Sequence, residues 1–416
     1  MSVHNQPSGS SERDLLRAGA FGLGVSAALP SFLNRVAEQE TKKILEGKEE
    51  KHPNRILVVL ELTGGNDGLN TIVPYGDDAY YRARPTIAIK PNDTIQLNDH
   101  FGLHPAMSGF EALFKDGKLA IVHGCGYPDP NLSHFTAMEW WHTAVPHGNE
   151  LYGWLGRFAD ENKQTPVENY IVNIGPRQSR AVASAKQSPI VFSDPKKLGR
   201  AGTDAQQRVF ELYGHPYETA NRSLDFVNTV SRTATAGAAL VRNACAEYRT
   251  MVDYGADSNL TLDLKKVIGL IKAGLMTRIY YVSLPGFDTH ASQAPTQNLL
   301  LIYLADALRG LMEDLERIGR ANDVSIMVFT EFGRRVGENM SGGTDHGTAT
   351  PMYIVGKQLK GGFYGQPPSL TDLDNGNLKM TTDFRSVYGT MLKEWMGFDD
   401  IQGVLKGDFP LLGVFA

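Results

Sequence analysis

Residues 56–62, Ile-Leu-Val-Val-Leu-Glu-Leu, run directly into residues 63–68, Thr-Gly-Gly-Asn-Asp-Gly. The first stretch is apolar throughout except for one acid, and glycines end it. A short apolar run without alternation is typical of a strand that is buried on both faces of a parallel sheet. We therefore expect a central strand at Ile56–Leu62, followed by a polar loop at its carboxyl end.

Three further runs of similar length predict strands, at Leu119–His123, Tyr280–Leu284 and Val324–Thr330. Segments with apolar residues at helical spacing separate them, notably 106–114 and 296–318. Strands that alternate with helices favour an α/β fold with a mostly parallel central sheet and helices on both faces.

The segment 148–263 does not share this alternation. It has few clear strands and a long helical part at Tyr213–Met251. We interpret it as a helical insertion or cap within one domain that spans residues 53–416. A final helix is expected within Thr381–Phe398.

Residues 1–52 are predicted to be an export signal and a linker. Arg13 and Arg17 precede the apolar stretch Ala18–Leu33, which is the layout of a signal segment. That stretch is shorter than the roughly 20 apolar residues that a spanning helix needs, so no stable membrane span is expected. The alternative is an amphipathic helix packed on the domain.

The export route is suggested by residues 11–17, Ser-Glu-Arg-Asp-Leu-Leu-Arg, which resemble the twin-arginine signal pattern. Glu12 stands where that pattern has its first arginine. The sequence thus predicts a protein of the periplasm or cell envelope.

The charge distribution argues against nucleic acid as a partner. The chain has 41 basic and 46 acidic residues, a net charge of −5, and both signs are spread along it. A nucleic-acid-binding protein normally has a concentrated basic surface. The sequence also lacks the G-x-S-x-G elbow, the phosphate-binding loop and the H-E-x-x-H motif, so serine esterases, P-loop enzymes and zincin proteases lose support.

Polar residues cluster where the predicted strands end, which is where ligands bind in open α/β sheets. Carboxylate and imidazole ligands without thiolate suit Zn²⁺, Mn²⁺, Mg²⁺ or Ca²⁺. The candidate site residues are Asn66, Asp67, Ser133, His134, Asp288, His290, Glu331, Arg334, Asp345 and His346.

Each cluster also has a purely structural interpretation. The segment 64–68 contains the usual turn residues, and Asp288 and Ser133 are residue types that cap helices. Residues 343–347, Gly-Thr-Asp-His-Gly, are the most suggestive of function, because a histidine lies between a carboxylate and a glycine.

Five motifs in this order resemble the bacterial exported family called domain of unknown function 1501 (DUF1501). They are residues 64–68 (GGNDG), 133–135 (SHF), 287–290 (FDTH), 330–334 (TEFGR) and 343–347 (GTDHG). The resemblance covers nearly the whole chain. It implies the fold of the alkaline phosphatase and sulfatase superfamily, whose members bind metal at the ends of parallel strands.

The resemblance also implies roles for individual residues. Asp67 resembles the metal ligand after the first strand, and Ser133 the nucleophile at a helix start. Asp288, His290 and His346 resemble one metal site. Asp345, which precedes His346 in the sequence, is a further expected metal ligand. Glu331 resembles the acid of a second site, in which Phe332 replaces a histidine.

The main hypothesis is therefore a metal-dependent hydrolase of phosphate or sulfate esters, acting on a small or polymeric anionic ester. Ser133 would be the nucleophile, a metal held by Asp67 and Glu331 would lower its pKa, and a second site at Asp288, His290 and His346 would stabilise the leaving oxygen. Arg334 would clamp the anion, and Asn66 and His134 would contact the substrate. The first rival is a non-catalytic envelope protein that uses the same fold for binding. The second is a serine hydrolase that needs no metal and uses Ser133, His346 and an acid.

Overall fold

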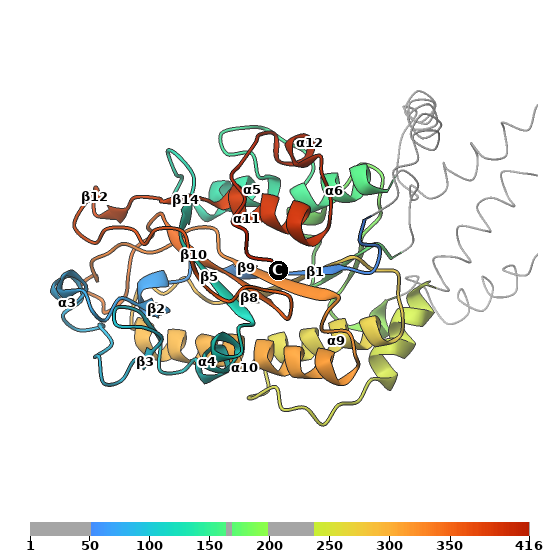
Figure 1. Cartoon of the computed structure of the whole chain (residues 1–416), viewed down its shortest axis with the longest axis horizontal. Coiled ribbons are helices and arrows are strands. Elements are labelled where there is room, and N and C mark those ends of the chain that lie inside the picture. Colours follow the sequence, from blue (N-terminus) through green and yellow to red (C-terminus); the bar gives the residue numbers. More distant parts are fainter. Residues whose placement is uncertain (1–50, 164–168, 199–236, 416) are drawn as a thin grey trace, which may run out of the picture.

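A nine-stranded sheet forms the centre of the computed structural model, which describes residues 51–163, 169–198 and 237–415. The strand order is β11-β5-β10-β9-β1-β8-β6-β7, with β14 beside β5. Figure 1 shows α5, α6, α11 and α12 on one side of the sheet and α4, α9 and α10 on the other.

The strands of this sheet are β1 (Ile56–Thr63), β5 (Leu119–Gly126), β6 (Ile171–Ile174), β7 (Ile190–Phe192), β8 (Ile279–Pro285), β9 (Val324–Phe329), β10 (Thr350–Gly356), β11 (Gly362–Tyr364) and β14 (Thr382–Asp383). Two small sheets contain β2 (Ile72–Val73), β3 (Ile95–Gln96) and β4 (Gly102–Leu103), and β12 (Leu373–Asp374) and β13 (Asn377–Leu378). The α-helices are α3 (Asp78–Ala83), α4 (Ser108–Lys115), α5 (His134–Thr143), α6 (Trp154–Asn162), α9 (Asn259–Lys272), α10 (Gln293–Arg317), α11 (Phe384–Thr390) and α12 (Ile401–Leu405).

Strand β1 is buried on both faces, which explains its unbroken apolar sequence. Val58 and Leu60 pack in the core beneath α4, α9 and α10, whereas Leu57 and Val59 pack in the core beneath α5, α6 and α11. Successive side chains of a strand point to opposite faces. A strand covered by helices on both sides therefore needs apolar residues at even and odd positions alike.

The predicted fold class is confirmed. Strand β1 pairs in parallel with β8 and β9, and β8 pairs in parallel with β6. In the described part of this sheet, only β10 runs antiparallel, between β9 and β5. Since β10 is antiparallel to both of its neighbours, β5 and β9 run in the same direction. Their carboxyl ends therefore lie at the same edge of the sheet as that of β1.

The four predicted strands are all present, and so are the helices predicted at 106–114 and 296–318, as α4 and α10. The final predicted helix is α11, which continues into a π-helical turn at Met391–Trp395. Within 148–263, β6 and β7 belong to the central sheet, so this segment is less purely helical than expected. Most of the helix predicted at Tyr213–Met251 lies outside the described residues, and 237–247 is helical.

The predicted export signal also lies outside the described residues, which begin at Lys51. In the ranges that the structure does describe, none of the helices is both long enough and apolar enough to cross a membrane.

Candidate metal centre

Two loops meet closely at the carboxyl ends of β1 and β8. Gly64 has a φ of +121°, and a Cβ placed on it would lie 2.4 Å from the backbone nitrogen of Asp288. Only glycine tolerates both that conformation and that approach. The glycines after β1 therefore allow the loop that carries Asp288 to lie against the end of the central strand.

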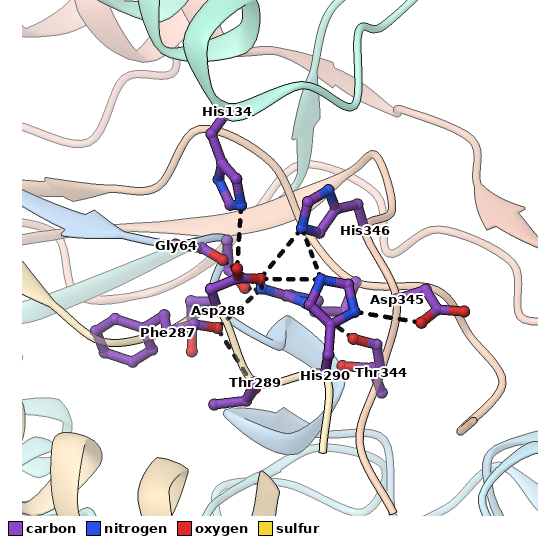
Figure 2. A network of polar contacts seen from close by, with 12 residues as sticks. Gly64, His134, Phe287, Asp288, Thr289, His290, Thr344, Asp345 and His346 are labelled. Carbon is purple, nitrogen blue, oxygen red and sulfur yellow. Dashed lines mark hydrogen bonds and ion pairs between the residues drawn. The ribbon is translucent and has the colours of Figure 1, made fainter. Parts of the chain in front are cut away.

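Three histidines converge on the carboxylate of Asp288 (Figure 2). The Nε2 atoms of His290 and His346 each lie 3.1 Å from Asp288 Oδ1 and 2.9 Å from each other. The Nε2 atom of His134 lies 3.4 Å from Asp288 Oδ2. His134 is the first residue of α5, His290 follows β8, and His346 follows β9, so three separate segments supply the imidazoles.

The opposite nitrogen of each ring contacts a hydrogen-bond acceptor. His134 Nδ1 lies 2.8 Å from Glu331 Oε1, His346 Nδ1 lies 2.8 Å from the carbonyl oxygen of Leu132, and His290 Nδ1 lies 3.3 Å from Asp345 Oδ1. Since a carbonyl oxygen can only accept, Nδ1 of His346 carries the proton, which leaves the lone pair of the neutral ring on Nε2. Histidines that bind metals usually have a hydrogen-bond acceptor of this kind on the nitrogen that faces away from the metal.

The spacing of these atoms fits a metal ion. One possible ligand atom each of His134, His346 and Asp288 lies within 4.8 Å of the other two, and His290 is outside this group of three. Bonds of 2.0–2.1 Å at tetrahedral angles separate neighbouring ligand atoms by roughly 3.3 Å. The separations of 2.9 to 3.4 Å around Asp288 are close to that value.

Electrostatics keep Asp288 ionised. Burial alone would raise its pKa, but the hydrogen bond from Arg334, the contact with His346 and the positive charge of Arg334 lower the pKa to about 2. The side chain is nevertheless 47% exposed. Asp288 is therefore an accessible carboxylate that stays negative at any physiological pH.

The pKa of His134 is raised, whereas that of Asp288 is lowered. Its hydrogen bond with Glu331 raises its pKa above the ordinary histidine value, and this effect outweighs the partial burial of the ring, which lowers the pKa. Glu331 itself is fully buried, and the backbone N–H of Gly64 donates to the same oxygen at 2.9 Å. Glu331 thus orients His134 and does not reach the point where the Nε2 atoms meet.

Arg334 does not have the free guanidinium that an anion clamp needs. It is buried and donates to the carbonyl oxygens of Gly65, Thr344 and Phe287 at 2.7, 2.8 and 3.0 Å. It also donates to Asp288 Oδ1 at 2.8 Å. The prediction that Arg334 binds substrate is corrected, because these contacts use its donors to hold loops together and to fix Asp288.

Asp67 and Asn66 also lie apart from the histidines. Both oxygens of Asp67 accept from Arg84, at 2.6 and 3.0 Å, and Gln293 Nε2 donates to Oδ2 at 2.6 Å. The side chain of Asn66 exchanges hydrogen bonds with Thr71. The pairing of Asp67 with Glu331 at one metal, and substrate contact by Asn66, find no support in these contacts, since buried protein groups already satisfy both side chains.

Ser133 lies at the edge of the cluster, at the N-cap of α5. It is exposed, and its hydroxyl makes no capping hydrogen bond. Its neighbours on both sides contact the centre, because the carbonyl of Leu132 accepts from His346 and the ring of His134 faces Asp288. Ser133 therefore lies in the chain between two residues that contact the centre.

Phe332 lies next to the cluster, and it is the residue that replaces the histidine of the expected second metal site. It is buried, and its ring centroid lies 4.9 Å from that of His134 and 4.7 Å from that of His346. An apolar ring cannot bind a metal, so the described residues provide for one centre here, and Phe332 supports two of its imidazoles.

The comparisons with known proteins identify the family. The family model described as "Protein of unknown function (DUF1501)" matches residues 54–405. The chain belongs to the DUF1501 family. The resemblance of the five motifs is thus confirmed, while a search of curated proteins found no match for this DUF1501 protein.

Solved structures similar to this DUF1501 protein include members of the alkaline phosphatase superfamily. One is a protein of that superfamily from Vibrio parahaemolyticus, with 10% identity and a TM-score of 0.40 over 96% of this chain and 78% of that one. A lipoteichoic acid synthase from Listeria monocytogenes has 8% identity and a TM-score of 0.38 over 90% and 80%. The periplasmic domain of EptC from Escherichia coli, solved with Zn, has 11% identity and a TM-score of 0.37 over 75% and 74%.

Two features of the centre in this DUF1501 protein were missed in the sequence. His134 was interpreted as a substrate contact, yet its Nε2 atom faces Asp288 with the other imidazoles. Arg84, which neutralises Asp67, lies in a segment without any motif. The histidine next to Ser133 was a signal that could have been used, whereas nothing in the sequence around Arg84 indicates its partner.

Proposed function

We propose that this protein is a metal-dependent hydrolase of phosphate or sulfate esters in the cell envelope. The observation that carries the proposal is the convergence of three imidazole Nε2 atoms on an ionised, accessible carboxylate, with an acceptor on the Nδ1 side of each ring. Acceptors on the Nδ1 atoms fix the orientation of the rings, so that the Nε2 atoms point toward one shared metal position. Metal-binding histidines usually have acceptors in this place.

Asp288, His290 and His346 would hold the metal, and His134 joins them as a ligand. A set rich in imidazole favours Zn²⁺ over Mg²⁺, Ca²⁺ and Mn²⁺, which prefer oxygen ligands. A bound divalent ion supplies a Lewis acid that balances the charge of a transferring phosphoryl or sulfuryl group and lowers the pKa of a nucleophile. Asp345, Glu331 and the carbonyl of Leu132 hold the imidazoles in orientation.

Ser133 is the proposed nucleophile. Its Oγ would lose its proton and bond to the phosphorus or sulfur atom, while the bond to the ester oxygen breaks and that oxygen leaves with a proton as the alcohol. Water would then cleave the bond to Oγ, which releases phosphate or sulfate and restores the serine hydroxyl. The start of α5, which is ten residues long, favours the negative charge of such a group through its free backbone N–H groups. Ser133 is exposed at that position, so an ester can reach it.

The proposed substrate is a small or polymeric anionic ester outside the cytoplasm. The arginines and apolar residues of the N-terminal segment support export, and the dispersed charge argues against nucleic acid.

One observation favours the non-catalytic alternative. Three histidines and one aspartate can supply four protein ligands, and structural metal sites are closed in this way, whereas catalytic sites keep a position open. The 47% exposure of Asp288 favours an open site instead.

The deciding experiment combines elemental analysis of untagged protein with aryl phosphate and aryl sulfate turnover, before and after chelation. We expect one bound metal and turnover that chelation removes. Protein that holds metal but turns over neither ester would support the binding protein, and activity that survives chelation would support the serine hydrolase.

A variant assigns the nucleophile. Ser133→Ala should lower turnover by a factor of 10³ or more, roughly as for other nucleophile deletions, while the metal content stays the same. Ser369→Ala is the matched control, since Ser369 is also exposed and its hydroxyl bonds only within its own turn. Activity retained in Ser133→Ala would remove Ser133 from this role.

A further inference from the structure

Two buried threonines belong to the loops that carry the candidate metal ligands. Thr289 lies in the chain between Asp288 and His290, and Thr344 lies two residues before His346. The backbone N–H of Thr344 donates to the carbonyl oxygen of Thr289 at 3.2 Å, so the two loops are in direct contact. Asp288 and His290 are exposed, whereas both threonines are buried. The threonines therefore form the inner side of the two ligand loops.

One side chain accepts hydrogen bonds from both threonines. Gln293, the first residue of α10, is fully buried. Its Oε1 atom accepts from the hydroxyl of Thr289 at 3.1 Å and from that of Thr344 at 2.6 Å. Its backbone N–H also donates to the carbonyl oxygen of Gly342 at 2.9 Å. Gln293 thus links the loop after β8 to the loop after β9 from inside the protein.

The nitrogen of this amide fixes its orientation. Gln293 Nε2 donates to Asp67 Oδ2 at 2.6 Å and to Gln297 Oε1 at 2.9 Å. Asp67 is a carboxylate paired with Arg84, so it can only accept, and the Gln293 atom that faces it is the nitrogen. The oxygen therefore faces the two hydroxyl groups. Because Nε2 has two acceptors, the loss of one of them leaves the other to hold the amide.

The spacing of the ligand atoms depends on how these two loops lie against each other. The Nε2 atoms of His290 and His346 come one from each loop and lie 2.9 Å apart, close to the roughly 3.3 Å between tetrahedral ligand atoms. Such a site must be held to within about 0.5 Å, which requires support from behind the ligands. We propose that Gln293 is a positioning residue of the metal centre, which holds both loops where their imidazoles share one ion. This role rests on the metal centre of the proposed function.

The test compares Gln293→Met with Gln297→Met, its matched control. Both glutamines are buried on α10, so both substitutions remove a buried amide at similar volume and should destabilise the fold. Gln297 bonds to Asp67, Thr71 and Gln293 and to neither threonine of the ligand loops. In competition with a chromophoric chelator, Gln293→Met should bind Zn²⁺ about tenfold more weakly, whereas Gln297→Met should change the affinity less than twofold.

A milder pair of variants tests the same link at Thr344. Thr344→Val removes the hydroxyl that donates to Gln293 and keeps the shape of the side chain. It should weaken Zn²⁺ binding roughly fivefold, the size expected for one lost hydrogen bond. Thr344→Ser keeps the hydroxyl and should bind Zn²⁺ as the parent does. In the Co²⁺ form, the visible absorption should change in Gln293→Met and Thr344→Val and stay the same in Thr344→Ser.

Hydrogen exchange of the metal-free, full-length chain measures the link without any metal. The backbone N–H of Thr344, which donates to the other loop, should exchange about tenfold faster in Gln293→Met, because two lost hydrogen bonds ease local opening. In Gln297→Met it should exchange at the parent rate.

Two results would overturn the positioning role: the two glutamine variants bind Zn²⁺ equally well, or Thr344→Val binds Zn²⁺ as tightly as Thr344→Ser. If the parent itself binds no Zn²⁺, the proposed function fails instead. The exchange rates of Thr344 then still decide whether Gln293 holds the two loops together.

Discussion

Asp67 and Asp288 follow neighbouring parallel strands, yet their surroundings give them different roles. Asp67 is 1% exposed and forms an ion pair with the equally buried Arg84. Asp288 is 47% exposed and faces the imidazoles. A carboxylate that protein donors fully satisfy has no lone pairs to offer a metal, so accessibility and partners, and not the motif alone, assign the ligand.

The structural role of Asp67 leads to the first prediction. Asp67→Asn leaves Arg84 charged and buried, and breaking a buried pair on one side costs about 3–5 kcal/mol. Urea unfolding should show a loss of this size, while metal affinity changes less than twofold. Asp372→Asn, which breaks the exposed pair with Lys379, should cost under about 1 kcal/mol. A loss of metal from stably folded Asp67→Asn would return Asp67 to the ligand set.

Asp345 gives a second prediction at this scale. It accepts from Asn339 at 3.0 Å and contacts His290 Nδ1 at 3.3 Å. Second-shell partners of this kind change metal affinity by 10- to 100-fold. Asp345→Asn should weaken Zn²⁺ binding by about tenfold or more, as measured by competition with a chromophoric chelator. Asp93→Asn, at an exposed position, should leave Zn²⁺ binding unchanged. Equal affinities would mean that Asp345 does not orient His290.

At the scale of elements, α5 is fixed to the sheet at both ends by histidine–glutamate contacts. At its start, His134 contacts Glu331, and near its end His142 Nε2 lies 2.8 Å from Glu61 Oε2. Tyr281 of β8 donates to the same oxygen of Glu61. Because Glu61, His142 and Glu331 are buried, these contacts hold the helix that carries His134 in one position.

This arrangement predicts a pH-dependent stability. Burial would raise the pKa of Glu61, but the charge of His142 and hydrogen bonds from His142, Tyr281 and Thr63 lower it below the ordinary value of 4.5. A lowered pKa stabilises the fold fully above the unfolded value and ceases to do so as the pH falls through the folded value. Glu61→Gln should therefore lower the free energy of unfolding by about 3 kcal/mol at pH 7. The difference in unfolding free energy between the variant and the parent should shrink below pH 4.5.

The comparison is made by urea unfolding at several pH values. Glu111→Gln serves as the control, because Glu111 pairs with Lys115 on the surface of α4 and should show little effect at any pH. A difference that stays constant between pH 7 and pH 3.5 would contradict ionisation of Glu61 as the source.

The strands that could be predicted from the sequence are those with long apolar runs. Strands β1, β5, β8 and β9 contain such runs because helices cover both sheet faces. Strands β6, β7 and β11 have three or four residues each and pair toward the margins of the sheet, so periodicity says little about them. The antiparallel direction of β10 depends on its partners, which local sequence does not encode.

For the whole molecule, the centre depends on segments that are distant in the chain. Asp288, His290 and His346 could be predicted because they follow strands at one edge of the sheet. The structural roles of Asp67 and Arg334 could not, since they depend on Arg84 and on carbonyl oxygens of three loops. The sequence thus indicates the edge of the sheet where the candidate residues gather, and side-chain packing determines which of them lie close together.

The dispersed origin of the ligands predicts that metal stabilises the whole fold. A ligand that binds only the folded state at 100 times its dissociation constant adds about 2.7 kcal/mol to the unfolding free energy. Because residues 134, 288, 290 and 346 come together only in the folded chain, Zn²⁺ at that excess should raise the urea midpoint, and a chelator should reverse the shift. His346→Ala removes one imidazole and should lose most of this increment, whereas His100→Ala, which removes an exposed histidine outside the cluster, should retain it. A Zn²⁺-induced shift of equal size in His346→Ala and the parent would place the stabilising metal elsewhere in the chain.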